Sequence, residues 1–325
     1  MLPKTPPFED LPLRKDGPPG NAWGLFGDND KLGTLNRLTP ENTRQAAEEI
    51  QYGIRISTDW TLSGPKTPCF KRQPFNHQIC RMLPRAVNDD VLTFNTQSST
   101  QWDGFRHYGY QTERVYFNGV KQEQFDDSAE YGIDVWVENG GIVGRGVLLD
   151  WGSWMASQGR NPDLLASTLI NVSDLEAVAA AQKVQFRPGD ILLIRSGLVK
   201  TLDSLSAEEV EAYMSQEPEP PIMGLEAGER MLRWLWDHEF SAVAGDMLTL
   251  EAQPFPKTHI LHEWLIAGWG MPIGELFDLE RLAQECKTRM KWSVYQVLKP
   301  KFRTLTLFEQ VPGGIASPPN GVAIL

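Results

Sequence analysis

The chain has little cysteine, no excess of positive charge and no long apolar run, and each shortage excludes a class of protein. Its three cysteines are an odd number and none lies in a CxxC spacing, which favours free thiols in a reducing compartment. A net charge of −11 argues against nucleic acid or an anionic membrane as the main partner. No window approaches the roughly 18 apolar residues of a spanning helix. Because the first residues also lack the apolar core of a secretion signal, we expect a cytoplasmic protein.

What the chain does contain is typical of a soluble globular protein. Hydrophobic residues make up 41% and charged residues 22% of 325 positions, enough for a substantial core. Residues 1–22 are rich in proline and show no periodicity, so we expect an extended arm that is loose or wrapped over a neighbour.

Strand and helix patterns alternate along the rest of the chain. Capping residues and apolar periodicity predict helices at 39–50, 173–183, 206–213, 225–238 and 278–286, the second and third of them started by capping boxes at Ser173–Glu176 and Ser206–Glu209. Apolar runs predict strands at 54–58, 91–94, 141–150, 191–194, 242–246, 292–298 and 304–308, and the segment 114–119 predicts a strand with a turn at Asn118-Gly119. This order predicts an α/β or α+β fold with a mixed sheet.

The most informative stretch is Gln97-Ser-Ser-Thr-Gln-Trp-Asp-Gly-Phe-Arg-His107, which follows the predicted strand at 91–94. Gln97, Gln101, Asp103 and His107 lie an even number of residues apart, so an extended or turning backbone could point all four into one cavity. Such side chains can ligate a metal or move protons near neutral pH. The alternative is a polar strand end whose side chains only cap nearby backbone groups.

A second stretch of interest runs from Thr258 to Glu275. Thr258 could cap a helix that places His259 and His262 in its first turns, on neighbouring faces. Glu275 follows a short apolar run and could emerge from a strand end. His77 and His238 have no partner nearby in sequence, and we interpret them as structural.

Six blocks in the same order and spacing resemble the cyclase family of bacterial kynurenine formamidase and isatin hydrolase. They lie at 23–36, 100–107, 146–150, 189–197, 262–275 and 317–320. Glutamine before Trp-Asp-Gly is most similar to the fungal branch. The resemblance implies one catalytic domain over 23–325, with the swivelling β/β/α fold, in a homodimer or homotetramer.

The family motif is His-x-Gly-Thr-His-x-Asp-x-Pro-x-His, and it implies roles for matching residues here. Its two leading histidines, both metal ligands, correspond to Gln97 and Gln101, its aspartate ligand to Asp103 and its proton-transferring histidine to His107. A later histidine and glutamate that complete the family site correspond to His262 and Glu275, and we expect both to bind the metal.

Loss of two imidazoles makes us expect one divalent ion, zinc or manganese, rather than two. The expected ligands are Asp103, His262 and Glu275, with Gln101 as a weak fourth and His259 in reserve. Gln97, Trp23 and Arg106 are candidate contacts for a small aromatic substrate. Alternatively, Trp23 packs in the core and Arg106 forms an ion pair.

These observations leave three alternative functions. The first is a metal-dependent hydrolase of an amide, lactam or ester, similar to the arylformamidase of tryptophan catabolism, with His107 as proton shuttle. The second is a metal-free acid–base cyclase, dehydratase or isomerase of secondary metabolism. The third is a non-catalytic binding protein, which would need none of Asp103, His107, His262 and Glu275.

Overall fold

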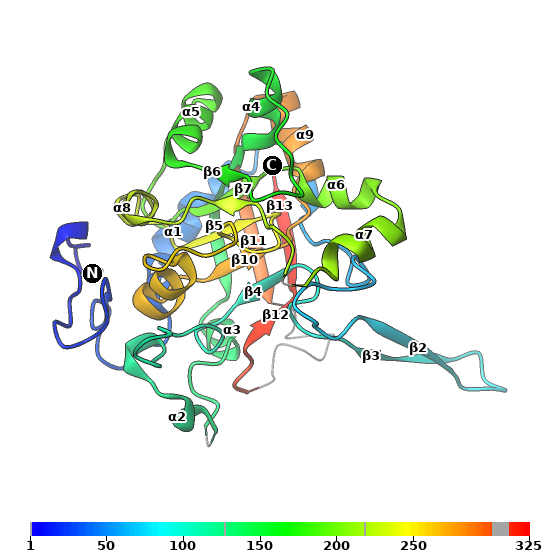
Figure 1. Cartoon of the computed structure of the whole chain (residues 1–325), viewed down its shortest axis with the longest axis horizontal. Helices are drawn as coiled ribbons and strands as arrows, with labels where there is room; N and C mark the ends of the chain where they lie inside the picture. The colour runs from blue at the N-terminus through cyan, green and yellow to red at the C-terminus, as the bar shows by residue number, and fades with distance from the viewer. Residues whose placement is uncertain (1, 127, 218, 301–311) are drawn as a thin grey trace.

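The structure is a computed structural model that describes residues 2–126, 128–217, 219–300 and 312–325. In this part of the chain nine strands form one mixed sheet in the order β1-β13-β11-β5-β7-β9-β10-β4-β12 (Figure 1). Their bounds are β1 Arg55–Ser57, β4 Gln101–Asp103, β5 Ile142–Asp150, β7 Ile191–Arg195, β9 Ala242–Gly245, β10 Ile273–Glu275, β11 Ser293–Pro300, β12 Ala316–Ser317 and β13 Pro319–Ile324. The expected mixed α/β fold is confirmed.

The centre of the sheet is parallel and its flanks are antiparallel. β5, β7, β9 and β10 pair in parallel, whereas β11 and β13 on one side and β4 and β12 on the other pair antiparallel. The segments 147–149 and 191–194 have no accessible surface, as expected for continuous apolar strands covered on both faces.

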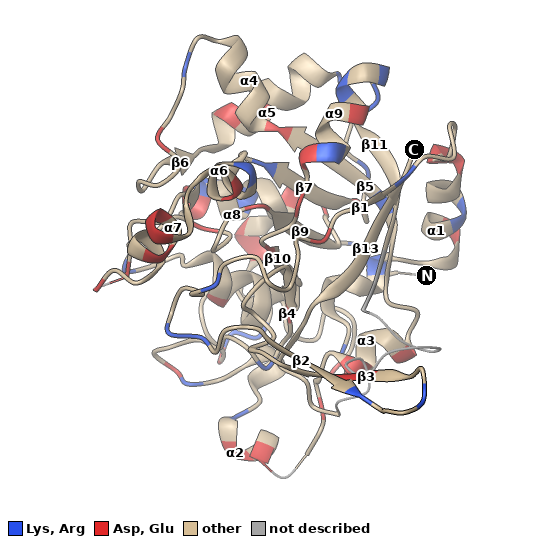
Figure 2. Ribbon diagram, turned by 90° about the vertical axis from the view of Figure 1, so that its right-hand side faces the viewer, with Lys and Arg blue, Asp and Glu red and all other residues tan. Residues whose placement is uncertain are grey.

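Helices lie around this sheet, and outer ones such as α7 and α9 contain charged residues (Figure 2). Their bounds are α1 Pro40–Ala46, α2 Gln122–Asp126, α3 Asp134–Glu138, α4 Trp151–Ser157, α5 Val172–Gln182, α6 Leu198–Ser204, α7 Ala207–Met214, α8 Glu229–Asp237 and α9 Glu280–Arg289. Among the described residues, none of these helices is both long and apolar enough to cross a membrane.

Two capping predictions can be compared with the structure. Ser206 and Glu209 form the predicted capping box at the start of α7. At α5 the prediction is wrong by two residues, because Asn171, not Ser173, accepts the backbone N–H of Asp174.

Two short sheets lie outside the main one. β6 (Leu169–Ile170) pairs with β8 (Gly224–Leu225), and β2 (Asn76–Arg81) pairs with β3 (Asn88–Thr93) as a long hairpin that projects from the body (Figure 1). The strand predicted at 91–94 therefore belongs to the hairpin, and the main sheet receives β4 from the glutamine-rich stretch itself.

Other segments differ from the sequence predictions. The segment 114–119 is not a strand, but its predicted turn at Asn118-Gly119 is confirmed: it ends in the 3₁₀ turn Phe117–Gly119, with Asn118 at φ 57°. The strand predicted at 304–308 lies outside the described residues.

The proline-rich arm packs on its own chain. Phe8 is buried and stacks on Trp264 with ring centroids 5.8 Å apart, and the indole N–H of Trp236 donates to the carbonyl of Pro6. The expectation of a loose or neighbour-bound arm is therefore wrong for this part of the arm, because aromatic burial fixes it in place.

Candidate metal centre and active site

The two stretches singled out in the sequence meet at the β4–β10 pair. Gln101 on β4 lies opposite Glu275 on β10, 174 residues away in sequence, and its amide Nε2 donates to Glu275 Oε2 at 2.7 Å. Ligand atoms of Asp103, His107 and His262 all lie within 4.8 Å of one another. The two stretches therefore meet in one cluster of side chains, as expected, while the roles of these residues remain predictions.

Gln97 connects the carboxylate and the imidazole of the first stretch. Its Nε2 donates to Asp103 Oδ1 at 2.7 Å and lies 3.2 Å from both ring nitrogens of His107. His107 Nε2 is 3.9 Å from the other oxygen of Asp103, Oδ2. Turns before and after β4, rather than one long extended segment, bring Gln97 and His107 to Asp103.

His262 lies between two carboxylates. Its Nε2 is 3.3 Å from Glu275 Oε1, and its Nδ1 is 2.9 Å from Glu251 Oε1. Glu275 Oε1 also accepts the backbone N–H of Leu250 at 2.9 Å. His262 directly precedes the π-helical segment Glu263–Trp269, an irregular helix type that is frequent at functional sites.

Burial and the neighbouring charges act in opposite directions on the pKa values of these groups. It raises the pKa of Asp103 above its ordinary value, although His107 opposes the shift, and it lowers the pKa of His107 against the pull of Asp103. For His262 burial also favours the neutral ring, but Glu251 and Glu275 together raise its pKa well above the ordinary value. His107 is therefore a neutral imidazole near pH 7, able to accept a proton.

The charges and unpaired atoms of this cluster suit a bound cation. Asp103, Glu251 and Glu275 are at most 2% exposed, and among the described residues their only ion-pair partners are His107 and His262. Three buried carboxylates thus face two imidazoles, an imbalance that is costly without further positive charge. Asp103 Oδ2 and Gln101 Oε1 are buried without a hydrogen-bond partner, and oxygen atoms of this kind are ligands for divalent metals. The residues present therefore fit one divalent ion.

Aromatic rings form one wall of the cluster. The rings of Tyr108 and Phe255 have their centroids 5.3 Å and 6.1 Å from that of His262, and both side chains are half-buried. A planar apolar group could pack there beside the imidazoles.

Two residues predicted to contact substrate have other partners. Trp23 is buried, and its indole N–H donates to the carbonyl of Ala267 at 2.7 Å. Arg106 donates to the carbonyls of Phe125 and Ser128 and lies over the Phe125 ring. For Trp23 these contacts favour the alternative of a core residue, and for Arg106 they show internal hydrogen bonds in place of the ion pair; a role of either residue in substrate binding stays a prediction.

The remaining histidines lie away from the cluster or outside its contacts. His259 has φ 62°, precedes the helical segment instead of lying in its first turn, and stacks on Trp264. His77 pairs with Asp90 across the hairpin, and His238 packs against Phe186.

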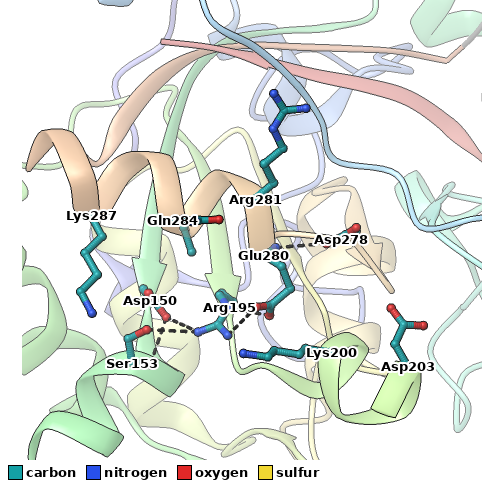
Figure 3. Close-up of a pocket in the computed structure, with 11 residues that line it drawn as sticks. Asp150, Ser153, Arg195, Lys200, Asp203, Asp278, Glu280, Arg281, Gln284 and Lys287 are labelled. Carbon is teal, nitrogen blue, oxygen red and sulfur yellow. Dashed lines mark hydrogen bonds and ion pairs between the residues drawn. The ribbon is translucent and has the colours of Figure 1, made fainter. Parts of the chain in front are cut away.

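A larger groove of about 770 Å³ lies at the carboxyl ends of β5 and β7 (Figure 3). At its base Arg195 is bonded to Asp150 at 2.7 Å and to both oxygens of Glu280. None of the clustered histidines or carboxylates lines this groove, and its buried arginine is already neutralised. We therefore take the histidine–carboxylate cluster as the candidate site.

Comparison with known proteins identifies the family. The family model Cyclase, described as "Putative cyclase", matches residues 38–252, about two thirds of the chain. The chain belongs to the cyclase family. This match ends before His262 and Glu275, so their place in the site rests on the structure.

Solved structures share the fold of this cyclase-family chain. A crystal structure described as a novel cyclase is 28% identical, with a TM-score of 0.80 over 94% of this chain and 99% of that one. Isatin hydrolase A from Ralstonia solanacearum is 16% identical, with a TM-score of 0.59 over 86% and 93%. Isatin hydrolase A from Labrenzia aggregata, bound to benzyl benzoate, is 13% identical, with a TM-score of 0.57 over 89% and 98%. The comparison with curated proteins gave no significant match.

Sequence reasoning missed Glu251. It lies on a loop 11 residues before His262, in no recognisable motif, and only the folded chain shows that its carboxylate contacts the histidine ring. The signal that could have indicated it is weak: an acidic residue in the run 247–252, where four of the other five residues are apolar.

Proposed function

We propose that this cyclase-family chain is a metal-dependent hydrolase that opens an amide, lactam or ester bond of a small aromatic molecule, in the manner of a kynurenine formamidase. The observation that supports this most is the excess of buried carboxylate around two imidazoles, together with the unpartnered oxygens of Asp103 and Gln101. A non-catalytic protein gains nothing from so costly an arrangement.

Asp103, His262 and Glu275 would hold one zinc or manganese ion, with Gln101 Oε1 as a weaker fourth ligand. His262 Nε2 and Glu275 Oε1 lie 3.3 Å apart, so both could contribute to holding the same ion. When bound, such an ion polarises a carbonyl and increases the acidity of water.

His107 would accept the proton from the attacking water and deliver it to the leaving nitrogen or oxygen. Its neutral state suits the first step, and Gln97 holds the ring beside Asp103. Tyr108 and Phe255 would pack against the substrate ring, and Gln97, which contacts Asp103 and His107, would be a further substrate contact.

Elemental analysis of protein purified without chelators tests this proposal. We expect close to one zinc or manganese per chain, lost in Asp103→Ala and in Glu275→Ala. A matched control is Asp246→Asn, because Asp246 is equally buried but bonds to the backbone of Ser196, Gly197 and Leu198 instead. If no metal binds under any loading condition, the hydrolase proposal is wrong.

One observation favours the second candidate, a metal-free acid–base enzyme. The amide groups of Gln97 and Gln101 donate to Asp103 and Glu275, and thereby supply part of the stabilisation that a cation would give. Turnover by metal-free protein, unchanged by added chelator, would establish this alternative.

A further inference from the structure

Glu251 is a buried carboxylate whose side-chain hydrogen bonds, within the described residues, go to the start of one helical segment. Its side chain has no accessible surface and follows β9 on a loop. It accepts the backbone N–H groups of Leu261 and of His262, the latter at 3.2 Å, and lies 2.9 Å from His262 Nδ1. One carboxylate therefore fixes both the backbone and the ring of His262.

We propose that Glu251 is a positioning residue that keeps the proton of the His262 ring on Nδ1 and turns Nε2 towards Glu275. An imidazole presents a ligand lone pair on one nitrogen when the other holds its proton in a hydrogen bond. The 3.3 Å from His262 Nε2 to Glu275 Oε1 shows that the ring already has this orientation. The consequence for metal affinity rests on the proposed function, whereas the ring orientation does not.

A purely structural role for Glu251 would be helix capping, and the chain contains a matched case. Asp246 is 1% exposed and accepts three backbone N–H groups at the start of α6, yet its hydrogen bonds include no histidine. Asp246→Asn therefore reproduces the loss of a buried capping carboxylate without touching His262.

The experiment compares Glu251→Gln with Asp246→Asn in the full chain. Zinc affinity is measured by competition with a chromogenic chelator, and the ring resonances of His262 by long-range ¹H–¹⁵N NMR, assigned with His262→Ala. We expect Glu251→Gln to weaken zinc binding by about 10–100-fold and to shift the Nδ1–H resonance. Asp246→Asn should lower the Tm but change neither quantity. If the two variants behave alike, Glu251 only caps the backbone and the proposal is wrong.

The wild-type protein gives a test that does not depend on a variant folding. The proposal requires a His262 Nδ1–H proton shifted far downfield by its carboxylate partner, with zinc perturbing Nε2. A ring whose Nδ1 binds zinc, or whose Nδ1 carries no such proton, would overturn it. Absence of both zinc and manganese binding in wild type would defeat the proposed function alone, since the Nδ1–H signal of the metal-free protein still tests Glu251.

Discussion

At the scale of single residues, the cluster separates side chains that hold a position from side chains that are free to react. Gln97, Gln101 and Glu251 each donate to or accept from another member of the cluster, and thereby fix Asp103, Glu275 and His262. His107 is 19% exposed at its side chain, whereas Asp103 is fully covered. This exposure suits the proton transfer that we propose for His107.

Replacing His107 tests this division. We expect His107→Ala to keep its metal and to lower kcat by about 10²–10⁴-fold, because a positioned proton carrier contributes that much. Metal content and turnover of a formylated or lactam-containing aromatic substrate measure the two effects. His77→Ala, in the exposed hairpin pair with Asp90, is the control and should be unaffected. Loss of metal in His107→Ala would show instead that His107 is a ligand, as its position near Asp103 and His262 allows.

At the scale of elements, short contacts between distant segments hold the sheet in register. Glu49 is the clearest example: it accepts from Arg145 of β5 at 2.9 Å, from Ser293 of β11 at 2.7 Å and from Lys291 at 2.5 Å. One carboxylate at the end of the 3₁₀ turn Ala47–Glu49 thus fastens this turn to two neighbouring strands.

The pH dependence of stability should reveal this contact. Burial alone would raise the pKa of Glu49, but the hydrogen bonds from Lys291 and Ser293 and the charges of Lys291 and Arg145 hold it below the ordinary value. A carboxyl group whose pKa is lowered by folding stabilises the protein above its unfolded pKa, and this contribution is lost as pH falls through the lowered value.

We therefore expect Glu49→Gln to reduce the free energy of unfolding by about 1–3 kcal/mol at pH 7. The difference from wild type should shrink below about pH 4.3, where the unfolded glutamate is protonated. Urea denaturation at a series of pH values measures this. Glu48→Gln, one residue earlier and exposed in a pair with Arg44, should change stability little at any pH. A pH-independent cost of Glu49→Gln would contradict the account.

At the scale of the whole molecule, the β2–β3 hairpin is notable because large apolar side chains on it are exposed to solvent. Ile79, Leu83 and Val91 are 61%, 80% and 52% exposed on it, and an isolated two-stranded hairpin is only marginally stable in water. We propose that a second copy of the chain covers it in the homodimer or homotetramer that the family resemblance implies.

Light scattering after gel filtration tests this assembly. We expect a dimer or tetramer for the wild type, and a shift towards monomer for a variant with Ile79→Lys and Leu83→Lys. The control is Tyr52→Lys. Tyr52 is also exposed but lies before β1 and outside the hairpin, so this variant should keep the assembly. A wild-type protein that is monomeric at high concentration would rule the assembly out. The cytoplasmic location likewise remains a prediction.

The amino-acid sequence by itself determined the elements whose signals are local. The apolar runs at 141–150 and 191–194 form strands because only a buried strand accommodates them, and Ser206 and Glu209 start a helix because their side chains satisfy its free N–H groups. The resemblance to the cyclase family also singled out Asp103, His107, His262 and Glu275, and the fold brings their side chains together.

Only the tertiary structure decided which partners these residues have. The pairing of β4 with β10 places Gln101 against Glu275, and a loop without a motif brings Glu251 to His262. Trp23 and Arg106 are polar enough to suit a substrate, but the fold uses them for internal contacts. Hydrogen bonds between residues distant in sequence depend on strand register and loop path, and neither leaves a periodic signal in the chain.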